Sequence, residues 1–306
     1  MSSPTGPANG LPVRMPRPRP AGRHRRPEPA VAPEGAPALV LAVPGAPSAA
    51  SRGLAEEILS IGRSELPGLD GRIGYLEGDD SEGSEFPSLA GVLTAVAQER
   101  SARAEFARAA GHEVPAPTGP DAVVVPLLVG PDGDLLRRAR QALMDSSAAA
   151  ELADVLGPHP LLAEGLHVRL SEAGLARADR ARLFTVTTAA DGIILATTGG
   201  EEAVQAAGIT GMLLAARLAV PVKAAALDQE GSVAAIAEQL RAEGSTQLAL
   251  APYLIGPEVA EGLLDTACKE AGCATGEVLG AYPALGKLAV AQYSAALGIT
   301  QGASAH

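Results

Sequence analysis

The sequence predicts an α/β protein made of two similar halves, each a parallel sheet with helices on both faces. Two observations lead to this fold class. Short, almost wholly apolar segments alternate with longer segments of helical periodicity, which is typical of parallel strands buried between layers of helices. Several of these segments also occur twice, in the same order along the chain. We therefore expect two duplicated halves that face each other across a cleft.

The duplication is visible in three pairs of segments that share apolar pattern and turn residues. LVLAVPGAPS resembles IILATTGGEE, VVVPLLVGP resembles LALAPYLIGP, and VLGPHPLLAEGLHVRL resembles VLGAYPALGKLAVAQY. Because each pair has one member in each half, the halves descend from one repeated unit. In the order given, the pairs lie at 39–48 and 193–202, 123–131 and 248–257, and 155–170 and 278–293.

Strands and helices are expected to alternate within each copy, with Ser48, Ser88 and Ser232 as N-caps. Ligands of such folds bind at the carboxyl ends of the strands. In the first copy we expect strands at 38–43, 72–77 and 122–128, and helices at 48–65, 87–110, 132–150 and 159–173. In the second copy we expect strands at 192–197, 221–227, 247–254 and 274–279, and helices at 201–218, 231–243, 257–271 and 283–296.

The chain is expected to divide into a tail and two halves. Residues 1–36 are rich in Pro and hold six arginines against two glutamates, without the apolar periodicity that a core needs, so they predict a disordered basic tail. The N-terminal half is expected at 37–178 and the C-terminal half at 187–300. The first half is the longer one, and its surplus lies within 78–120. The acidic run and the breaker-rich segment there predict surface insertions.

Composition excludes several classes of function. The net charge of the chain is −11, and the body is acidic, which argues against nucleic-acid binding. No apolar run approaches the roughly 20 residues that span a bilayer, and the Arg-rich start has no apolar core of a signal peptide. With only two cysteines, we expect a cytoplasmic protein without a disulfide framework. The basic tail and the acidic insertion are the candidate contacts for a protein partner.

Familiar catalytic motifs are missing from the predicted strand ends. The sequence holds no glycine-rich phosphate loop and no Gly-x-Ser-x-Gly elbow, and Ser48 and Ser51 fit better as helix-capping residues. His159 and His167 are eight residues apart rather than four, so a capping or packing role is favoured over a metal site.

Carboxylates remain as candidates. Glu77 ends the second predicted strand, and Asp132 and Asp134 follow the third. In the second copy, Asp228 with Glu230 and Glu258 with Glu261 hold similar places. Oxygen ligands suit hard divalent ions, although acidic residues after strands more often act as caps. The interpretation as metal ligands is retained for Glu77 and Asp134, because both are expected at the edge where ligands bind.

The order of these motifs resembles the sirohydrochlorin and cobalt chelatases, in particular their two-copy form. The segments that carry the resemblance are LVLAVPG, GYLE with FPSL, VVVPLLVGPDGD and LGPHPLL. The resemblance implies a chelatase-like fold and a lyase that inserts Co²⁺, Fe²⁺ or Ni²⁺ into a reduced tetrapyrrole. It also implies that Gly45 and Gly130 bind the tetrapyrrole, that Glu77 and Asp134 hold the metal, and that Asp134 is catalytic.

The sequence departs from the family at the histidines. Pro44 and Asp134 stand where the family has its first and second His, and the second copy has Thr198 and Glu261 there. A proline neither ligates a metal nor accepts a proton, whereas imidazole does both near neutral pH. We therefore keep two hypotheses: a chelatase-like protein that binds a divalent metal or a tetrapyrrole, with doubtful catalysis, and a non-catalytic binding or regulatory module on the same fold.

Overall fold

The structure is a computed structural model that describes seven segments of the chain. Residues 1–30 of the tail expected at 1–36, the segment 177–188 between the two expected halves and Glu261 lie outside the described residues, so the boundary between the halves stays a prediction. The described end of the expected tail is ordered, since the N–H of Ala32 donates to the carbonyl oxygen of Pro67 at 2.9 Å. The described segments are 31–33, 35–81, 83–112, 119–176, 189–256, 258–260 and 262–298.

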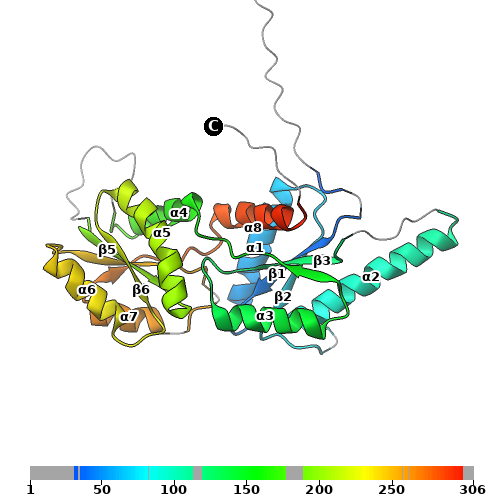
Figure 1. The fold of residues 1–306 in the computed structure, drawn as a ribbon, viewed down its shortest axis with the longest axis horizontal. Helices are drawn as coiled ribbons and strands as arrows, with labels where there is room; N and C mark the ends of the chain where they lie inside the picture. Colours follow the sequence, from blue (N-terminus) through cyan, green and yellow to red (C-terminus); the bar gives the residue numbers. More distant parts are fainter. Residues whose placement is uncertain are drawn as a thin grey trace, which may run out of the picture.

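Two lobes, each built on a four-stranded parallel sheet, lie side by side (Figure 1). The strand orders β2-β1-β3-β4 and β6-β5-β7-β8 are the same in both sheets, which confirms the predicted duplicated α/β fold. The strands of the first sheet are β1 (Ala38–Val43), β2 (Gly71–Tyr75), β3 (Ala122–Pro126) and β4 (Ala150–Leu152). Those of the second are β5 (Gly192–Thr197), β6 (Val222–Ala226), β7 (Leu248–Pro252) and β8 (Ala274–Thr275).

Eight helices cover the sheets in the described part of the chain. Most of them alternate with the strands, as the sequence predicts. They are α1 (Ala49–Glu65), α2 (Leu89–Ala109), α3 (Gly133–Asp145), α4 (Pro160–Glu172), α5 (Gly200–Leu218), α6 (Ser232–Ala242), α7 (Leu263–Ala271) and α8 (Pro283–Ala296).

The strands are buried on both faces, and alternate residues pack into different layers. In β1, Leu39, Leu41 and Val43 face the layer that contains α1, whereas Val40 and Ala42 face α2 and α3. This is the period-two geometry of a strand between two layers of helices. The same alternation in β5 and β7 separates the layer of α4 and α5 from that of α6 and α7.

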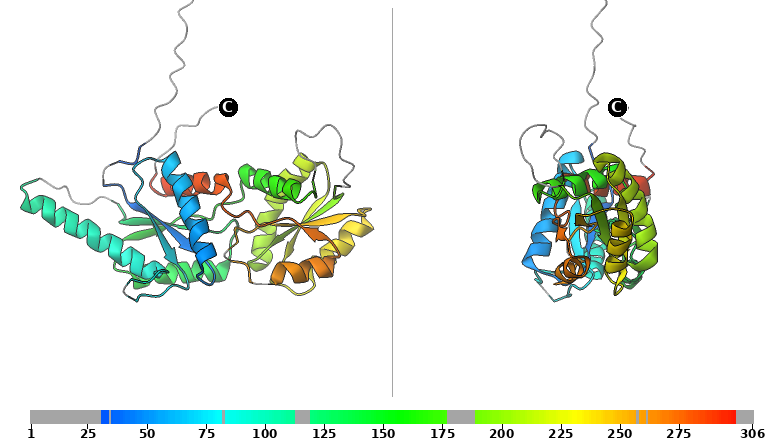
Figure 2. Two further views of the ribbon diagram at one scale, coloured as in Figure 1. Left: turned by 180° about the vertical axis from the view of Figure 1, so that it is seen from behind. Right: turned by 90° about the vertical axis from the view of Figure 1, so that its left-hand side faces the viewer.

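The last helix of each half packs on the other half. Helix α8, which ends the second half, lies against α1 and β3, and α4, which ends the first half, lies against α5 and β7. Figures 1 and 2 show both helices along the same side of the molecule, each over the sheet of the opposite lobe. The exchange requires the chain to cross between the lobes twice.

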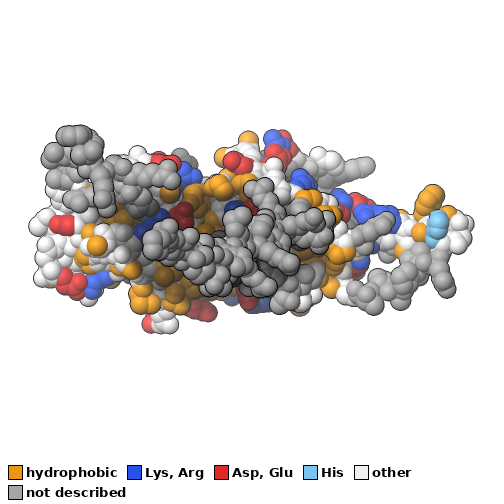
Figure 3. Space-filling view, turned by 90° about the horizontal axis from the view of Figure 1, so that it is seen from above, with side chains coloured by type: hydrophobic (Ala, Val, Ile, Leu, Met, Phe, Trp, Pro, Cys, Tyr) orange, Lys and Arg blue, Asp and Glu red, His pale blue; other side chains and the backbone are white. Residues whose placement is uncertain are grey.

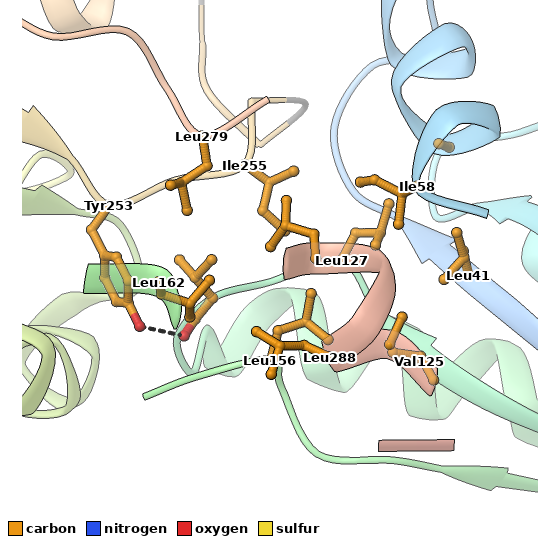
Figure 4. Packing of buried hydrophobic residues seen from close by; sticks show 14 of the residues in the cluster. Leu41, Ile58, Val125, Leu127, Leu156, Leu162, Tyr253, Ile255, Leu279 and Leu288 are labelled. Atoms are coloured by element: carbon orange, nitrogen blue, oxygen red, sulfur yellow. Dashed lines mark hydrogen bonds between the residues drawn. The ribbon is translucent and has the colours of Figure 1, made fainter. Parts of the chain in front are cut away.

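The exchanged helices join the two lobes through one hydrophobic core. A single cluster of buried residues runs from Leu41 and Ile58 in the first lobe to Tyr253 and Leu162 in the second (Figure 4). Leu127 and Ile255, just after β3 and β7, lie between the lobes in this view. Because burial of apolar side chains is the main stabilising term, the two lobes stabilise each other.

Polar contacts hold the crossings in equivalent ways. Arg169 of α4 donates from Nη2 to the carbonyl oxygen of Leu279 at 2.7 Å, and Gln292 of α8 donates to that of Val155 at 2.9 Å. Each exchanged helix thus satisfies a carbonyl group on the segment that leads into the other one. Such backbone groups would otherwise be left without a partner on a crossing segment.

Three local expectations are wrong. The predicted helix 132–150 ends at Asp145, because Ser146 is extended and its hydroxyl donates to the carbonyl oxygen of Leu143 at 2.8 Å. Ala150 then begins β4 and pairs with Ala122 of β3, so sheet pairing overrides its helix propensity. Ser232 is the first residue of α6 rather than its N-cap, and its hydroxyl accepts from the N–H of Ala226 at 3.0 Å.

Part of the surplus of the first half lies in one long helix. Helix α2 has 21 residues, whereas its counterpart α6 has 11, and it projects away from the lobes in Figure 1. The acidic run before it forms a turn in which Asp79 accepts hydrogen bonds from the hydroxyl of Ser84 and the N–H of Ser81.

The contact between α8 and α1 predicts how a minimal change disturbs the core. A β-carbon on Gly286 would meet the Cβ of Ile61 at 2.6 Å and the carbonyl oxygen of Ile58 at 2.8 Å. We expect Gly286→Ala to lower the free energy of unfolding by about 1–3 kcal/mol through overpacking. Urea unfolding followed by circular dichroism measures the change.

Gly53 of α1 is the matched control for this prediction. It is exposed, and nothing lies within 4 Å of a β-carbon placed there. Gly53→Ala should raise the free energy of unfolding by about 0.5–1 kcal/mol, since alanine loses less backbone entropy in a helix. Equal effects of the two substitutions would contradict the close packing of α8 on α1.

Candidate functional site

A pocket of about 700 Å³ opens between the lobes at the carboxyl ends of the strands. One wall is the loop after β1 with the start of α1, and the other is the loop after β7. This is the edge at which the sequence predicts a ligand site. The pocket is lined by Gly45, Ala46, Ser48, Ala50, Ser51, Leu54, Gly256, Glu258, Val259 and Ala260.

The first wall is held by a capping box at the start of α1. The hydroxyl of Ser48 accepts from the N–H of Ser51 at 3.1 Å, and the hydroxyl of Ser51 accepts from the N–H of Ser48 at 2.9 Å. Gly45 turns the chain just before, with a φ of +75° that favours glycine. The expected capping role of the two serines is confirmed, and it places their hydroxyls on the pocket wall.

The second wall carries the acidic group of the pocket. Glu258 accepts from the N–H of Ile255 at 2.6 Å and from the N–H of Gly256 at 2.8 Å. Burial raises the pKa of the Glu258 carboxyl, the backbone N–H groups oppose the rise, and the neighbouring Asp132 adds to it. The carboxylate therefore organises its own loop while it faces the pocket.

The described residues that line the pocket include no Arg, Lys or His. Arg52 follows Ser51 in α1, but its guanidinium forms an ion pair with Glu85. With Glu258 in the wall and Asp132 beside it, the potential in the pocket favours neutral or positively charged groups over anions.

The duplication relates the pocket to a second junction between the lobes, and this junction is closed. There the loop after β5 faces the loop after β3, and a β-carbon on Gly199 would overlap the carbonyl oxygen of Pro131. Asp228 accepts hydrogen bonds from the N–H groups of Gly199 and Gly200 at 2.9 and 3.0 Å. These backbone N–H groups at the start of α5 therefore already have a hydrogen-bond partner. The duplicated fold thus offers one open pocket and one closed contact at these two junctions.

Tyr253 connects the two lobes near the closed junction. Its hydroxyl accepts from Thr210 of α5 and donates to the carbonyl oxygen of Val129 in the other lobe, both at 3.1 Å (Figure 4). Burial raises the pKa of Tyr253 to about 12, so the phenol keeps its proton at neutral pH. No motif in the sequence pointed to this residue, because its role depends on a contact between the lobes.

The two predicted metal ligands do not line the pocket. Glu77 lies beyond the end of β2 and pairs with Nη1 of Arg138 at 3.0 Å. Asp134 lies in the first turn of α3, is 81% exposed and pairs with Nη2 of Arg137 at 2.6 Å. Each carboxylate is thus engaged by a different arginine of α3. Metal binding by this pair stays a prediction.

The two predicted glycines lie apart. Gly45 is in the wall of the pocket, whereas Gly130 is buried in the loop after β3 and is not among the lining residues. Asp132, in the same loop as Gly130, caps α3 by accepting from the N–H groups of Asp134 and Leu135. This is the capping role that most acidic residues after strands have.

The donor groups present do not fit Co²⁺, Fe²⁺ or Ni²⁺. No group of three or more His, Cys, Asp or Glu side chains that could hold a metal ion occurs within the described segments. Imidazole or thiolate ligands suit these ions better than paired carboxylates do. Pro44 is buried at the end of β1, where it offers no donor atom.

The remaining candidate groups are structural. His159 caps α4 by accepting from the N–H of Leu161 at 3.1 Å, as expected, and burial lowers its pKa. Burial raises the pKa of both thiols, to about 11 for Cys273, so neither Cys268 nor Cys273 is a reactive thiolate. No helix in the described part of the chain has the length and apolarity that a membrane crossing needs.

The raised pKa of Glu258 predicts a pH dependence of stability. The folded state holds the proton of this carboxyl more tightly than the unfolded chain, whose Glu pKa is about 4.3. Its contribution to the free energy of unfolding should therefore fall as the pH rises from about 4.3 towards the folded pKa. In Glu258→Gln this fall should be absent. Urea unfolding of both proteins between pH 4 and pH 8 measures the difference, and identical pH profiles would contradict it.

Comparisons with known proteins support the fold. No family model matches the chain, and no curated protein matches it. The sirohydrochlorin chelatase SirB from Bacillus subtilis subspecies spizizenii, solved in complex with cobalt, is similar with a TM-score of 0.53 at 12% identity, over 86% of this chain and 96% of that one. A multi-domain protein from Deinococcus radiodurans, with structural similarity to chelatases and two additional domains, is similar with a TM-score of 0.52 at 17% sequence identity, over 87% of this chain. This chain spans only 55% of the Deinococcus protein. The chain therefore has a chelatase-like fold.

Proposed function

We propose that this chain is a small-molecule binding module on a chelatase-like fold and that it does not catalyse metal insertion. The observation that supports this proposal is the open pocket of about 700 Å³ between the lobes. Its size is typical of ligand sites, and its place at the strand ends is where α/β folds bind their ligands. Its described lining holds hydroxyls and one carboxylate, but no imidazole, the group that both ligates these metals and accepts protons near neutral pH.

The chemistry of the wall favours a neutral or cationic polar ligand. Ser48 and Ser51 supply hydroxyl groups, and the glycine at position 45 exposes the backbone. Glu258 is the charged side chain among the described residues of the lining. A tetrapyrrole of the sirohydrochlorin class carries several carboxylates and would need basic partners. The described lining lacks them, so the wall disfavours that ligand.

A chelatase-like activity on a divalent metal and a tetrapyrrole is the second candidate. It is favoured by Glu77 and Asp134, which lie near the carboxyl end of the first sheet and next to the same helix α3. For metal binding, both carboxylates must leave their arginine partners. The exposed arginine pairs stabilise the free protein by at most about 1 kcal/mol each, so they do not by themselves prevent this.

Binding in the pocket is tested with a fragment library divided into anionic, neutral and cationic compounds. Ligand-observed NMR should detect neutral and cationic binders, and Ala50→Trp should abolish their signals because Ala50 lines the pocket. Ala102→Trp, on the exposed surface of α2, is the control and should leave binding unchanged. A predominance of anionic binders, or binding that survives Ala50→Trp, would overturn the proposal.

Metal insertion is tested separately by following the absorbance of sirohydrochlorin with Co²⁺. We expect no gain over the spontaneous rate, and no change in Asp134→Ala or Glu77→Ala. A gain that Asp134→Ala removes would establish the second candidate and refute the absence of catalysis.

Restoring the histidines should create a metal site that the natural sequence lacks. The double substitution Pro44→His with Asp134→His places imidazole at two positions that the chelatase resemblance marks for metal ligands. Isothermal titration with Co²⁺ should show binding in this variant and none in the natural protein. Pro47→His with Asp134→His is the matched control, and equal affinity in all three proteins would contradict the prediction.

A further inference from the structure

The outer face of α5 carries exposed apolar side chains. Ile209 is 47% exposed, Met212 67% and Leu213 39%. They follow the spacing i, i+3, i+4, so they lie together on one side of the helix. Figure 3 shows hydrophobic side chains gathered along the lower left edge of the molecule, on the lobe that contains α5.

The duplication supplies an internal reference for this face. The buried positions of α1 and α5 have the same spacing, with Ser51, Ala55, Ile58, Leu59 and Gly62 matching Ala203, Ala207, Thr210, Gly211 and Leu214. With this alignment, the exposed positions of the two helices can be compared one by one. Glu57, Ser60 and Ser64 of α1 match Ile209, Met212 and Ala216 of α5, and all six are exposed. Leu213 of α5 matches Ile61 of α1, which is apolar but less exposed.

The outer face of α5 differs from the equivalent face of α1 in a systematic way. The two helices sit in equivalent places in equivalent lobes, yet one exposes charged and polar side chains and the other exposes apolar ones. Isolated exposed apolar residues need no explanation, whereas a contiguous set, of which Ile209 and Met212 stand where α1 has a glutamate and a serine, marks an interaction surface. Between Glu202 and Arg217, α5 contains no charged residue at all.

The charges at the ends of α5 indicate what covers this face. Glu201 and Glu202 lie in the first turn and Arg217 in the last. Glu201 and Arg217 are each eight residues from Ile209. Two α5 helices packed antiparallel about a two-fold axis at Ile209 would therefore place the acidic end of each beside the basic end of the other. The helix dipoles would also oppose each other favourably.

The surroundings of α5 fit such a pairing. Nε of Arg217 donates to Nδ1 of His167 at 2.8 Å, which holds the guanidinium at the end of the helix. Nothing lies within 4 Å of a β-carbon placed on Gly208, so the backbone there is open to close approach. Beside α5 runs β6, the edge strand of the second sheet, which continues the same side of the lobe.

We propose that the outer face of α5, centred on Ile209, Met212 and Leu213, is the interface with a second copy of this chain in an antiparallel, two-fold symmetric dimer. A single helix pair with its flanks buries less than the about 1,200 Å² that stable interfaces start from. The dimer should therefore have a Kd in the micromolar range. This interface lies away from the pocket residues, and the proposal does not depend on the proposed function.

Sedimentation velocity of the full chain over a range of concentrations tests the proposal. We expect a reversible monomer–dimer equilibrium in the natural protein. Met212→Glu should weaken it by at least about tenfold, since it buries a charge in an apolar contact. Ser60→Glu, at the matching position of α1, and Phe106→Glu, at an apolar residue of α2 that is 78% exposed, are the controls and should leave it unchanged. Circular dichroism confirms that all variants fold.

A cross-link tests the symmetry. Ile209→Cys faces its own copy across the two-fold axis and should form a disulfide-linked dimer on mild oxidation, whereas Phe106→Cys should not. The natural protein, whose two thiols are partly buried, gives the background.

Three outcomes would overturn the proposal. A natural protein that stays monomeric at all concentrations would do so, as would a dimer that Met212→Glu leaves intact. The third is self-association that appears only when residues 1–30 are removed, because that result would make the tail the segment that covers α5.

Discussion

The exchange of α4 and α8 between the lobes is the constraint on which the rest of the structure depends. Each of these helices ends one half of the sequence and packs on the sheet of the other half. Without the exchange, the α1 and α5 faces of the two sheets would lose part of their cover, and the buried cluster would divide in two. The exchange also sets the distance between the strand ends of the two lobes, because the crossing segments run between them.

The two junctions show how a duplicated fold becomes asymmetric. Asp228 and Glu77 follow the equivalent strands β6 and β2, but they have different partners. Asp228 binds the start of α5 and draws its loop into contact with the other lobe. Glu77 binds Arg138 of α3 instead, and the start of α1 is satisfied by its own serines. The two equivalent carboxylates thus have different partners, and the junction is closed at Asp228 and open in the half that contains Glu77.

The resemblance to chelatases is a resemblance of fold at low sequence identity. The two parallel sheets and their helix layers form a chelatase-like fold, and similar solved structures share this architecture at low sequence identity. The donor atoms that metal insertion needs are not assembled in the described part of the chain. Pro44 follows the end of β1 and has no side-chain donor atom for a metal. Asp134 is exposed to solvent and forms an ion pair with Arg137. A shared fold does not by itself determine the reaction, because packing and catalysis rest on different residues.

The sequence by itself determined the secondary structure of most of the chain and the duplication. β1 and β5 begin and end where the apolar pattern predicts, and Ser48 and Ser88 cap their helices. These features depend on residues close together in the chain, so local patterns suffice to predict them. Only the tertiary structure decided which sheet each exchanged helix covers, that Tyr253 reaches Val129, and that the pocket opens at Gly45 rather than at Gly199. Those outcomes depend on contacts between residues far apart in the sequence, and no local pattern encodes them.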